Sequence, residues 1–273
     1  MNTLKLQSLN LSFLLTLSIG AITIIETQWH DLQILVGVTI ISFIFFFIIN
    51  IKDIGFLYRT VKHNFKDTLL LTALAFSVFT ALFMAQKNGV TPVTYSLIFS
   101  VATPMISYIY TKDFLRSAIL GILLLIIIAL STPNIYLIVA LIGPLAAYFL
   151  LKTSRIICIR ENLNANQIMF IRYLLLFVIV VAIAPFQHFN KVNFEAIELF
   201  KILVIAFFLN ITPLYCSQKI ALIKDHNYVA KLASFLPLTI FILEFVFFSH
   251  STDIQELLLS MVLISTMFIF LNK

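Results

Sequence analysis

Ten apolar stretches separated by short polar segments constrain the fold of this chain more than any other feature. They cover residues 9–26, 32–51, 67–86, 91–110, 114–131, 134–154, 166–186, 197–218, 228–248 and 254–271. The segments between them include Lys52–Asp67, which we expect to be a basic loop, and Lys87-Asn88-Gly89, which we expect to be a turn. About 20 apolar residues in a helix cross the hydrocarbon core of a bilayer. Inside lipid, helices and closed barrels are the structures that satisfy every backbone polar group. The pattern therefore predicts an all-α integral membrane protein with ten transmembrane helices.

The composition agrees with this prediction. Of the 273 residues, 61% are hydrophobic and 11% are charged, whereas soluble domains average roughly 45–50% and about 25%. The net charge of +6 is not interpreted as a nucleic-acid signal, because the charges lie in short loops and form no basic run. Cys158 and Cys216 are far apart in sequence and predict neither a disulfide framework nor a metal site.

The distribution of Lys and Arg predicts the orientation. If the N-terminus is cytoplasmic, 13 of the 18 fall in cytoplasmic segments, three in external segments and two within spans. Cytoplasmic loops of membrane proteins carry this excess. We therefore expect a multi-pass protein of the bacterial inner membrane with both termini in the cytoplasm. The first stretch could instead be a signal peptide, but nine further stretches favour a retained helix.

An internal repeat relates the fourth and ninth stretches. Tyr95 and Tyr228 each precede a proline by nine residues, Pro104 and Pro237, and a Gln-Lys pair lies upstream of each tyrosine. Two halves of five helices, 9–131 and 134–271, follow from this match. Because five is odd, the second half must be inserted upside down, which places a substrate site near the midplane between the halves. Chance similarity between apolar helices is the alternative.

The residues of this repeat carry a family resemblance. Thr72–Gly89, then TPVTYSLIFSVATPMISYIYTKDFLRSAILGILLL from Thr91, and ASFLPLTIFILEFVFFSHSTDIQELLLSMVLI from Ala233 resemble the drug/metabolite transporter superfamily, in particular its EamA-type members. The resemblance implies ten spans in two inverted five-helix repeats. It also implies alternating access to a central cavity lined largely by spans 3, 4, 8 and 9.

Four hydroxyl side chains form a stripe on the span 91–110, namely Ser96, Ser100, Thr103 and Ser107. Their steps of 4, 3 and 4 residues keep them within about 60° of arc on a helix. The stripe is a candidate cavity wall that binds substrate and water. Close helix packing is an equal alternative, because small residues let helices approach in lipid. Pro104 beside the stripe is a candidate kink.

Charged and amide side chains within spans are further candidates. Lys231 either faces the cavity, with Ser234 on a similar face, or reaches back to the cytoplasmic interface. Asn210, ahead of Pro213, either lines the cavity at a helix break or packs between helices. Arg172 is expected to reach the interface or pair with a neighbouring helix rather than contact substrate.

The two repeat motifs are also gate candidates. Tyr95, Tyr228, Pro104 and Pro237 occupy matching positions of the two halves. The tyrosines could act as symmetric gates, although interface anchoring would explain them without any function.

The function expected from the sequence is secondary transport of a small organic metabolite, such as an amino acid or carboxylate, across the cytoplasmic membrane. The embedded cations favour an anionic or zwitterionic solute, and proton coupling and oligomeric state are left open. A non-transporting scaffold or subunit, or a membrane-embedded lipid enzyme, is the alternative. The spans contain no DxxD or HxxxH pattern and the chain contains no P-loop, so we expect no enzyme, cofactor, metal or nucleic-acid partner.

Overall fold

The computed structural model describes residues 3–131, 133–186, 195–248 and 254–271, and the elements in these ranges are all helices. Eight helices are long and apolar enough to cross a membrane: α1 (Thr3–Glu26), α2 (Asp31–Ile49), α4 (Phe65–Lys87), α5 (Pro92–Tyr110), α7 (Tyr136–Glu161), α8 (Ala165–Ile183) and the composite segments Ala196–Ile223 and His226–Val246. They indicate a multi-pass helical membrane protein. The other two predicted spans correspond to α6 (Phe114–Leu130) and α13 (Ile254–Leu271).

Both composite segments change helix type close to a proline. The first consists of α9 (Ala196–Ile205), the π-helical η4 (Ala206–Ile211) and α10 (Thr212–Ile223). The second consists of α11 (His226–Leu232), the 3₁₀ turn η5 (Ala233–Phe235), α12 (Leu236–Leu243) and the π-helical η6 (Glu244–Phe248). Pro213 and Pro237 lack the N–H that would continue the α-helical hydrogen bonds, so the turn before each proline rearranges.

Local sequence explains where several helices begin and end. Thr91 caps α5 by accepting a hydrogen bond from the N–H of Thr94 at 3.0 Å, and Pro92 follows at the first helical position. Asp225 caps α11 through the N–H of Tyr228 at 2.6 Å. The turn at Lys87-Asn88-Gly89 is confirmed, and Gly89 adopts a φ of 93° that favours glycine.

The segment Lys52–Asp67 was expected to be a basic loop, and that prediction is wrong. It contains the short 3₁₀ turn η1 (Ile51–Asp53) and the helix α3 (Ile54–His63). Leu57 and Val61 are one helical turn apart and buried, whereas Arg59 and Lys62 are exposed. This amphipathic spacing stabilises a helix against the bundle despite its high charge.

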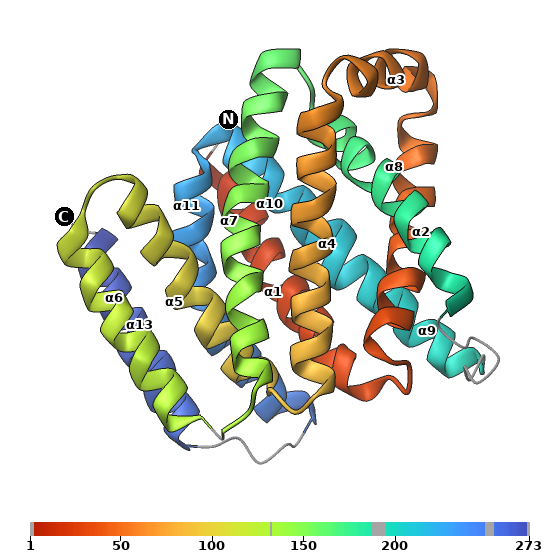
Figure 1. Ribbon diagram of the computed structural model, residues 1–273. Coiled ribbons are helices and arrows are strands. Elements are labelled where there is room, and N and C mark those ends of the chain that lie inside the picture. The colour runs from red at the N-terminus through yellow and green to blue at the C-terminus, as the bar shows by residue number, and fades with distance from the viewer. Residues whose placement is uncertain (1–2, 132, 187–194, 249–253, 272–273) are drawn as a thin grey trace.

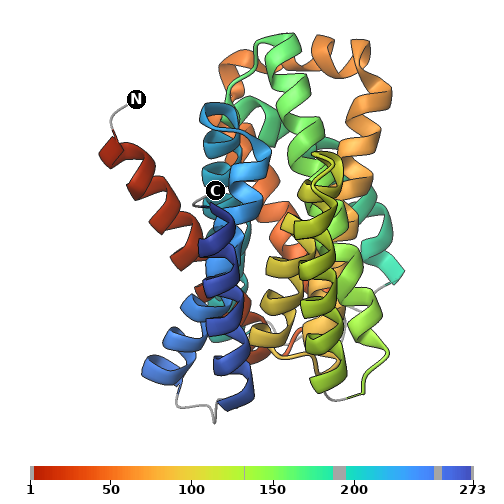
Figure 2. The ribbon, with the colours of Figure 1, turned by 90° about the vertical axis from the view of Figure 1, so that its left-hand side faces the viewer.

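The long helices form a bundle with α3 lying across one end (Figure 1). In it α4 packs along α7, α2 along α8 and α1 along α10. Helix α5 contacts α6, α7 and the α11–η5–α12 segment. Helices α6 and α13 lie together at one flank (Figures 1 and 2), and α1 begins and α13 ends toward the end of the bundle that carries α3.

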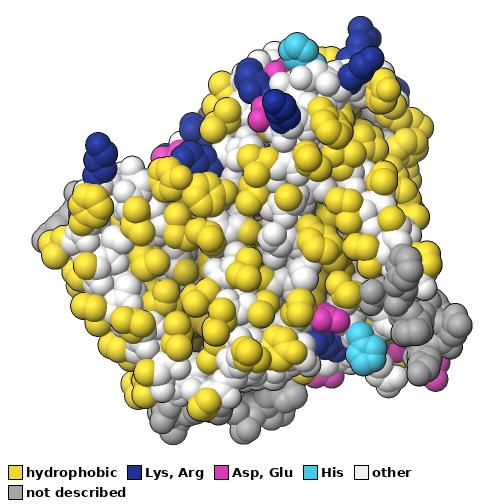
Figure 3. All heavy atoms as spheres, in the orientation of Figure 1, with side chains coloured by type: hydrophobic (Ala, Val, Ile, Leu, Met, Phe, Trp, Pro, Cys, Tyr) yellow, Lys and Arg dark blue, Asp and Glu magenta, His cyan; other side chains and the backbone are white. Residues whose placement is uncertain are grey.

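The outer surface of the bundle is apolar. Hydrophobic side chains cover the middle of the face in Figure 3, and Lys and Arg gather along its upper edge, where α3 lies. Ile122, Leu125 and Phe245 are 60%, 68% and 68% exposed. A soluble protein would not expose so continuous an apolar surface, so this belt faces lipid.

Candidate functional site

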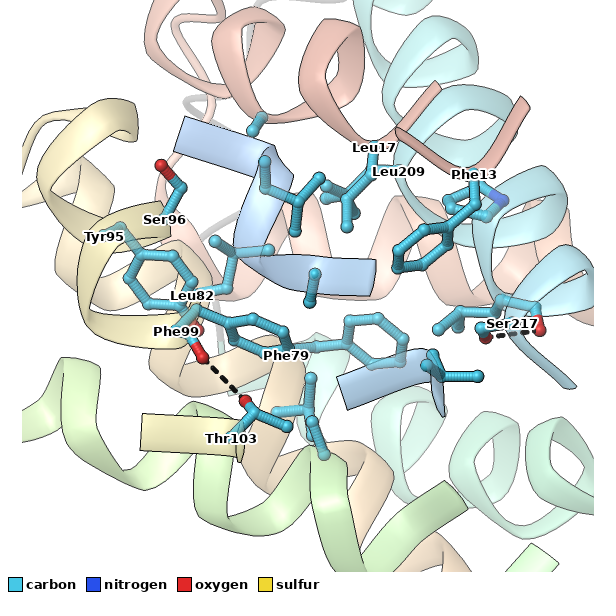
Figure 4. Close-up of a pocket in the computed structure, with 18 of the residues that line it drawn as sticks. Phe13, Leu17, Phe79, Leu82, Tyr95, Ser96, Phe99, Thr103, Leu209 and Ser217 are labelled. Carbon is cyan, nitrogen blue, oxygen red and sulfur yellow. Dashed lines mark hydrogen bonds between the residues drawn. The ribbon is translucent and has the colours of Figure 1, made fainter. Parts of the chain in front are cut away.

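A cavity of about 100 Å³ lies inside the bundle, among α1, α4, α5, α7, α8, α10 and the α11–α12 segment. Most of its wall is aliphatic or aromatic, as Phe13, Phe79, Leu82 and Leu209 show in Figure 4. A cavity needs at least about 10–15 Å³ to hold one water, and apolar cavities of this kind stay dry. The cavity therefore has room for a small organic molecule and offers it mainly apolar contacts.

Three hydroxyl residues of the wall are already hydrogen-bonded within their own helices. They are Ser96, Thr103 and Ser217, and their acceptors are the carbonyl oxygens of Val93, Phe99 and Leu214, at 2.7, 2.7 and 2.9 Å. Each hydroxyl thus donates its single hydrogen atom to a backbone carbonyl. It can therefore accept a hydrogen bond from a ligand but cannot donate one.

Three other wall residues have polar atoms without a protein partner. Both side-chain amide atoms of Gln86, the hydroxyl of Tyr95, and Nε and Nη1 of Arg172 are buried and unpartnered. The three residues are 4%, 6% and 0% exposed. Most buried polar groups in proteins are hydrogen-bonded, so these three residues beside one cavity are exceptions.

Arg172 is held by neutral groups. Its Nη2 donates to Ser154 Oγ at 2.8 Å and to Gln218 Oε1 at 3.4 Å. It pairs with no carboxylate among the residues that the structure describes. Because Arg172 is fully buried, it does not reach the membrane interface. A guanidinium charge thus lies in the wall without a counter-ion.

The polar groups lie at two ends of the cavity. In Figure 4, Tyr95 and Ser96 lie on one side and Ser217 on the other, with Phe79 between them. Arg172 binds Gln218, which follows Ser217 in α10, so the cation belongs to the Ser217 end. Gln86 lies in the last turn of α4 and Tyr95 in the first turn of α5, and the short connection between these helices places both at the same end of the cavity.

Tyr95 approaches α7 where that helix has a glycine. A Cβ atom added to Gly143 would lie 2.2 Å from the Tyr95 hydroxyl oxygen. The missing side chain therefore leaves the space that the hydroxyl occupies. The matching tyrosine of the second half, Tyr228, accepts a hydrogen bond from Nδ2 of Asn10 at 2.9 Å and does not line the cavity.

The two proline segments cross beside the cavity and exchange hydrogen bonds. A proline at position i cannot donate to the carbonyl at i−4, so the carbonyls of Ser100 and Ala233 lose their α-helical partners. The Ala233 carbonyl instead accepts from the N–H of Leu236 in the 3₁₀ turn. Ser100 Oγ donates to the Ala233 carbonyl at 2.6 Å, and Ser234 Oγ donates to the Ser100 carbonyl at 3.4 Å. Each segment thus donates a hydrogen bond to the carbonyl that the proline of the other segment deprives of its α-helical partner.

The hydroxyl stripe divides between two environments. Ser96 and Thr103 line the cavity, whereas Ser100 joins the crossing and Ser107 donates to Asn227 Oδ1 at 2.6 Å. Two of the four hydroxyl residues thus border the cavity, and the other two join α5 to the second proline segment.

The other predicted site residues lie outside this cavity wall. Lys231 Nζ lies 5.5 Å from the centre of the Tyr108 ring. Asn210 donates to Ser42 Oγ at 2.9 Å and accepts from the Tyr173 hydroxyl, so it joins η4 to α2 and α8. These contacts agree with the packing and anchoring alternatives for the two residues.

Sequence reasoning gave too little weight to Arg172 and Gln86. The sequence shows how deep Arg172 lies in its span but not which way it faces, and Gln86 was noted only as part of the repeat. The match of Gln86-Lys87 with Gln218-Lys219 was the available signal, since both glutamines are buried beside this cavity or its arginine.

No set of three or more His, Cys, Asp or Glu side chains in the described ranges could hold a metal ion. No family model matches the chain, and a search of curated proteins finds no significant match.

Proposed function

We propose that this chain is an EamA-type secondary transporter of the drug/metabolite transporter superfamily. It moves a small organic metabolite across the bacterial cytoplasmic membrane by alternating access. The observation that carries the proposal is the cavity itself, which is enclosed by helices of both predicted halves and holds the unpaired Arg172. A scaffold would not require an internal cavity with unmet hydrogen bonds.

Matching contacts support the inverted repeat that this proposal includes. A shift of 133 residues takes Pro104 to Pro237 and Tyr95 to Tyr228. The same shift takes Asn10, the partner of Tyr228, to Gly143, which faces Tyr95. Two tyrosine contacts and the crossing thus agree on one relation between residues 9–131 and 134–271.

The helix packing supports the same relation. If the first five spans correspond to the last five, each contact should have a mate in which the halves are exchanged. The contact of α4 with α7 has its mate in α1 with α10, and that of α5 with α7 in α1 with α12. The contact of α4 with α8 corresponds to that of α2 with η4.

The orientation in the proposal places α3 on the cytoplasmic side. Lys and Arg gather at that end of the bundle, toward which α1 begins and α13 ends (Figures 1 and 3). The excess of positive charge supports cytoplasmic termini.

Alternating access would require contacts at the two ends of the bundle to break in turn. At the outer end, buried Glu198 accepts from Thr27 Oγ1 at 2.8 Å and from the N–H of Gln28 at 2.9 Å, and it pairs with Lys201 at 2.8 Å. At the α3 end, Arg160 joins Asn64 and Asp67, each at 2.6 Å.

Counterflow uptake tests the proposal. Proteoliposomes carrying the protein would be loaded with a mixed metabolite pool, and the solutes that exchange would be identified by mass spectrometry. We expect selective accumulation by the wild type and its loss in Leu82→Trp, which fills the cavity. The matched control, Ile122→Trp, adds the same group to the lipid-facing surface and should retain uptake. If correctly folded wild-type protein accumulates nothing, the chain is a scaffold or subunit instead.

A further inference from the structure

Arg172 is the only charged residue in the wall of the described cavity. A buried charge without a counter-ion is costly in a membrane protein, and residues of this kind usually mark a substrate or ion path. Two of its nitrogen atoms have no hydrogen-bond acceptor, and the third is held by the neutral side chains of Ser154 and Gln218. The missing partner is therefore an anion that also accepts hydrogen bonds.

The rest of the wall determines which kind of group the anion can carry besides its charged end. Phe13, Phe79, Phe99 and Leu82 supply apolar contacts between the two ends, and the nearby hydroxyls already donate to their own backbones. A strongly hydrated solute would lose its water here without replacement. An apolar group would fill the dry space favourably, and a volume of about 100 Å³ is several times what one water needs.

The end of the cavity opposite Arg172 limits how many charges a ligand can carry. Gln86 and Tyr95 offer an amide and a hydroxyl there, and both are neutral. An ammonium group or a second carboxylate on the ligand would lie in the apolar wall without a counter-ion, at a large cost. Amino acids and dicarboxylates therefore fit this cavity poorly.

We propose that the cavity binds a small amphipathic organic monoanion, whose carboxylate pairs with Arg172 and whose apolar body lies among the phenylalanine and leucine side chains. This inference rests on the proposed function, because it narrows the substrate of the transporter from small metabolites in general to aryl or alkyl monocarboxylates.

The first test uses wild-type protein in lipid nanodiscs and tritiated 3-phenylpropionate as the probe, read by scintillation proximity. We expect saturable binding that unlabelled acid competes away. The uncharged amide of the same body should compete at least about tenfold more weakly, because it loses the charge-assisted bonds to Arg172. Phenylalanine and succinate should also compete weakly, because the ammonium group of the first and the second carboxylate of the other would lie in the apolar wall without a counter-ion. Equal competition by the acid and the amide would overturn the proposal without any variant.

The second test replaces the cation. Arg172→Gln should weaken probe binding at least about tenfold, and Arg172→Lys should restore part of it. Arg155→Gln is the matched control, because Arg155 lies in α7 outside the cavity wall, and it should bind as the wild type does. If Arg172→Gln does not fold, as judged by gel filtration, Leu82→Trp serves in its place and should abolish binding.

The two proposals can fail separately. Exchange of polar solutes in liposomes by a protein that does not bind 3-phenylpropionate would overturn the monocarboxylate site and leave a transporter. Arg172-dependent binding by a protein that exchanges no solute, including the probe, would keep the site and overturn transport.

Discussion

The two proline segments occupy matching places in the two halves, yet they differ in structure and in the state of their tyrosines. Helix α5 continues through Pro104 without a break, whereas the second segment changes to a 3₁₀ turn just before Pro237. The hydroxyl of Tyr95 is buried without a partner, whereas that of Tyr228 binds Asn10.

The same proline motif therefore makes different hydrogen bonds in the two halves. In the second half the carbonyl of Ala233 receives the shorter hydrogen bond, and the tyrosine is tied to α1. In the first half the carbonyl of Ser100 receives a long hydrogen bond, and the tyrosine hydroxyl is buried beside Gly143 without a hydrogen-bond partner. The second half thus makes the stronger hydrogen bonds across the crossing and to α1, and the first half leaves a buried hydroxyl without a protein partner.

The largest expected effect comes from filling the space beside Tyr95. Gly143→Ala would place a Cβ atom 2.2 Å from the Tyr95 hydroxyl oxygen and should lower the free energy of unfolding by about 1–3 kcal/mol, as overpacking does. Tyr95→Phe removes that oxygen, so the same substitution should cost much less in its background. Thermal unfolding of the four proteins checks this coupling. An equal loss in both backgrounds would contradict the contact.

The crossing should show the next largest effect. Ser100→Ala removes the 2.6 Å hydrogen bond to the Ala233 carbonyl and should cost about 1 kcal/mol of unfolding free energy, near the upper part of the range for membrane helices. Ser234→Ala removes a 3.4 Å hydrogen bond and should cost about half of that or less. Denaturation in SDS would compare them. Equal destabilisation by the two variants would contradict the expected difference in strength between the two hydrogen bonds.

The two tyrosines should respond in opposite directions to loss of the hydroxyl. Tyr228→Phe breaks the bond to Asn10 and should destabilise the protein by about 0.5 kcal/mol. Tyr95→Phe removes a buried hydroxyl that has no protein partner, so it should be neutral or stabilising by a similar amount. Melting temperatures in one detergent measure both changes. Destabilisation by Tyr95→Phe alone would reverse the comparison.

The smallest effect is expected from an ion pair at the surface that also joins the halves. Arg160 and Asp67 are 46% and 39% exposed at the side chain, and exposed pairs contribute about 0–1 kcal/mol. Arg160→Gln should therefore change the unfolding free energy by about 0.5 kcal/mol or less, with a smaller difference at high salt. A larger loss of unfolding free energy would mean that this surface ion pair, rather than the crossing, contributes most to holding the two halves together.

Sequence reasoning located the helices well because long apolar stretches leave few alternatives in lipid. Each of the ten stretches corresponds to helix in the described residues, while α3 was missed because its charges suggested a loop. The π and 3₁₀ turns were not predicted, since a proline removes a donor without determining how the chain rearranges around it. The inverted repeat and the function stay predictions that the proposed experiments test.

The candidate site was predicted less well because sequence gives depth in the membrane but not direction. Lys231 and Arg172 both lie within spans, and Lys231 was favoured, yet Arg172 is the one that lines the cavity. The members of the hydroxyl stripe divide between the cavity and the contact with the second segment. Which of its members face the cavity depends on where α5 crosses the second segment, and this crossing is a tertiary contact.

Chemical modification of the two native cysteines can report how often the cavity opens. Cys158 and Cys216 are 2% and 4% exposed, and Cys158 Sγ lies 3.7 Å from Gln218 Nε2, beside Arg172. Thiol-modifying reagents in water reach such buried sulfur atoms only when the surrounding helices separate. The rate of modification of the unaltered protein therefore measures how often the arginine end of the cavity opens, and a bound anion that holds this end closed would slow it.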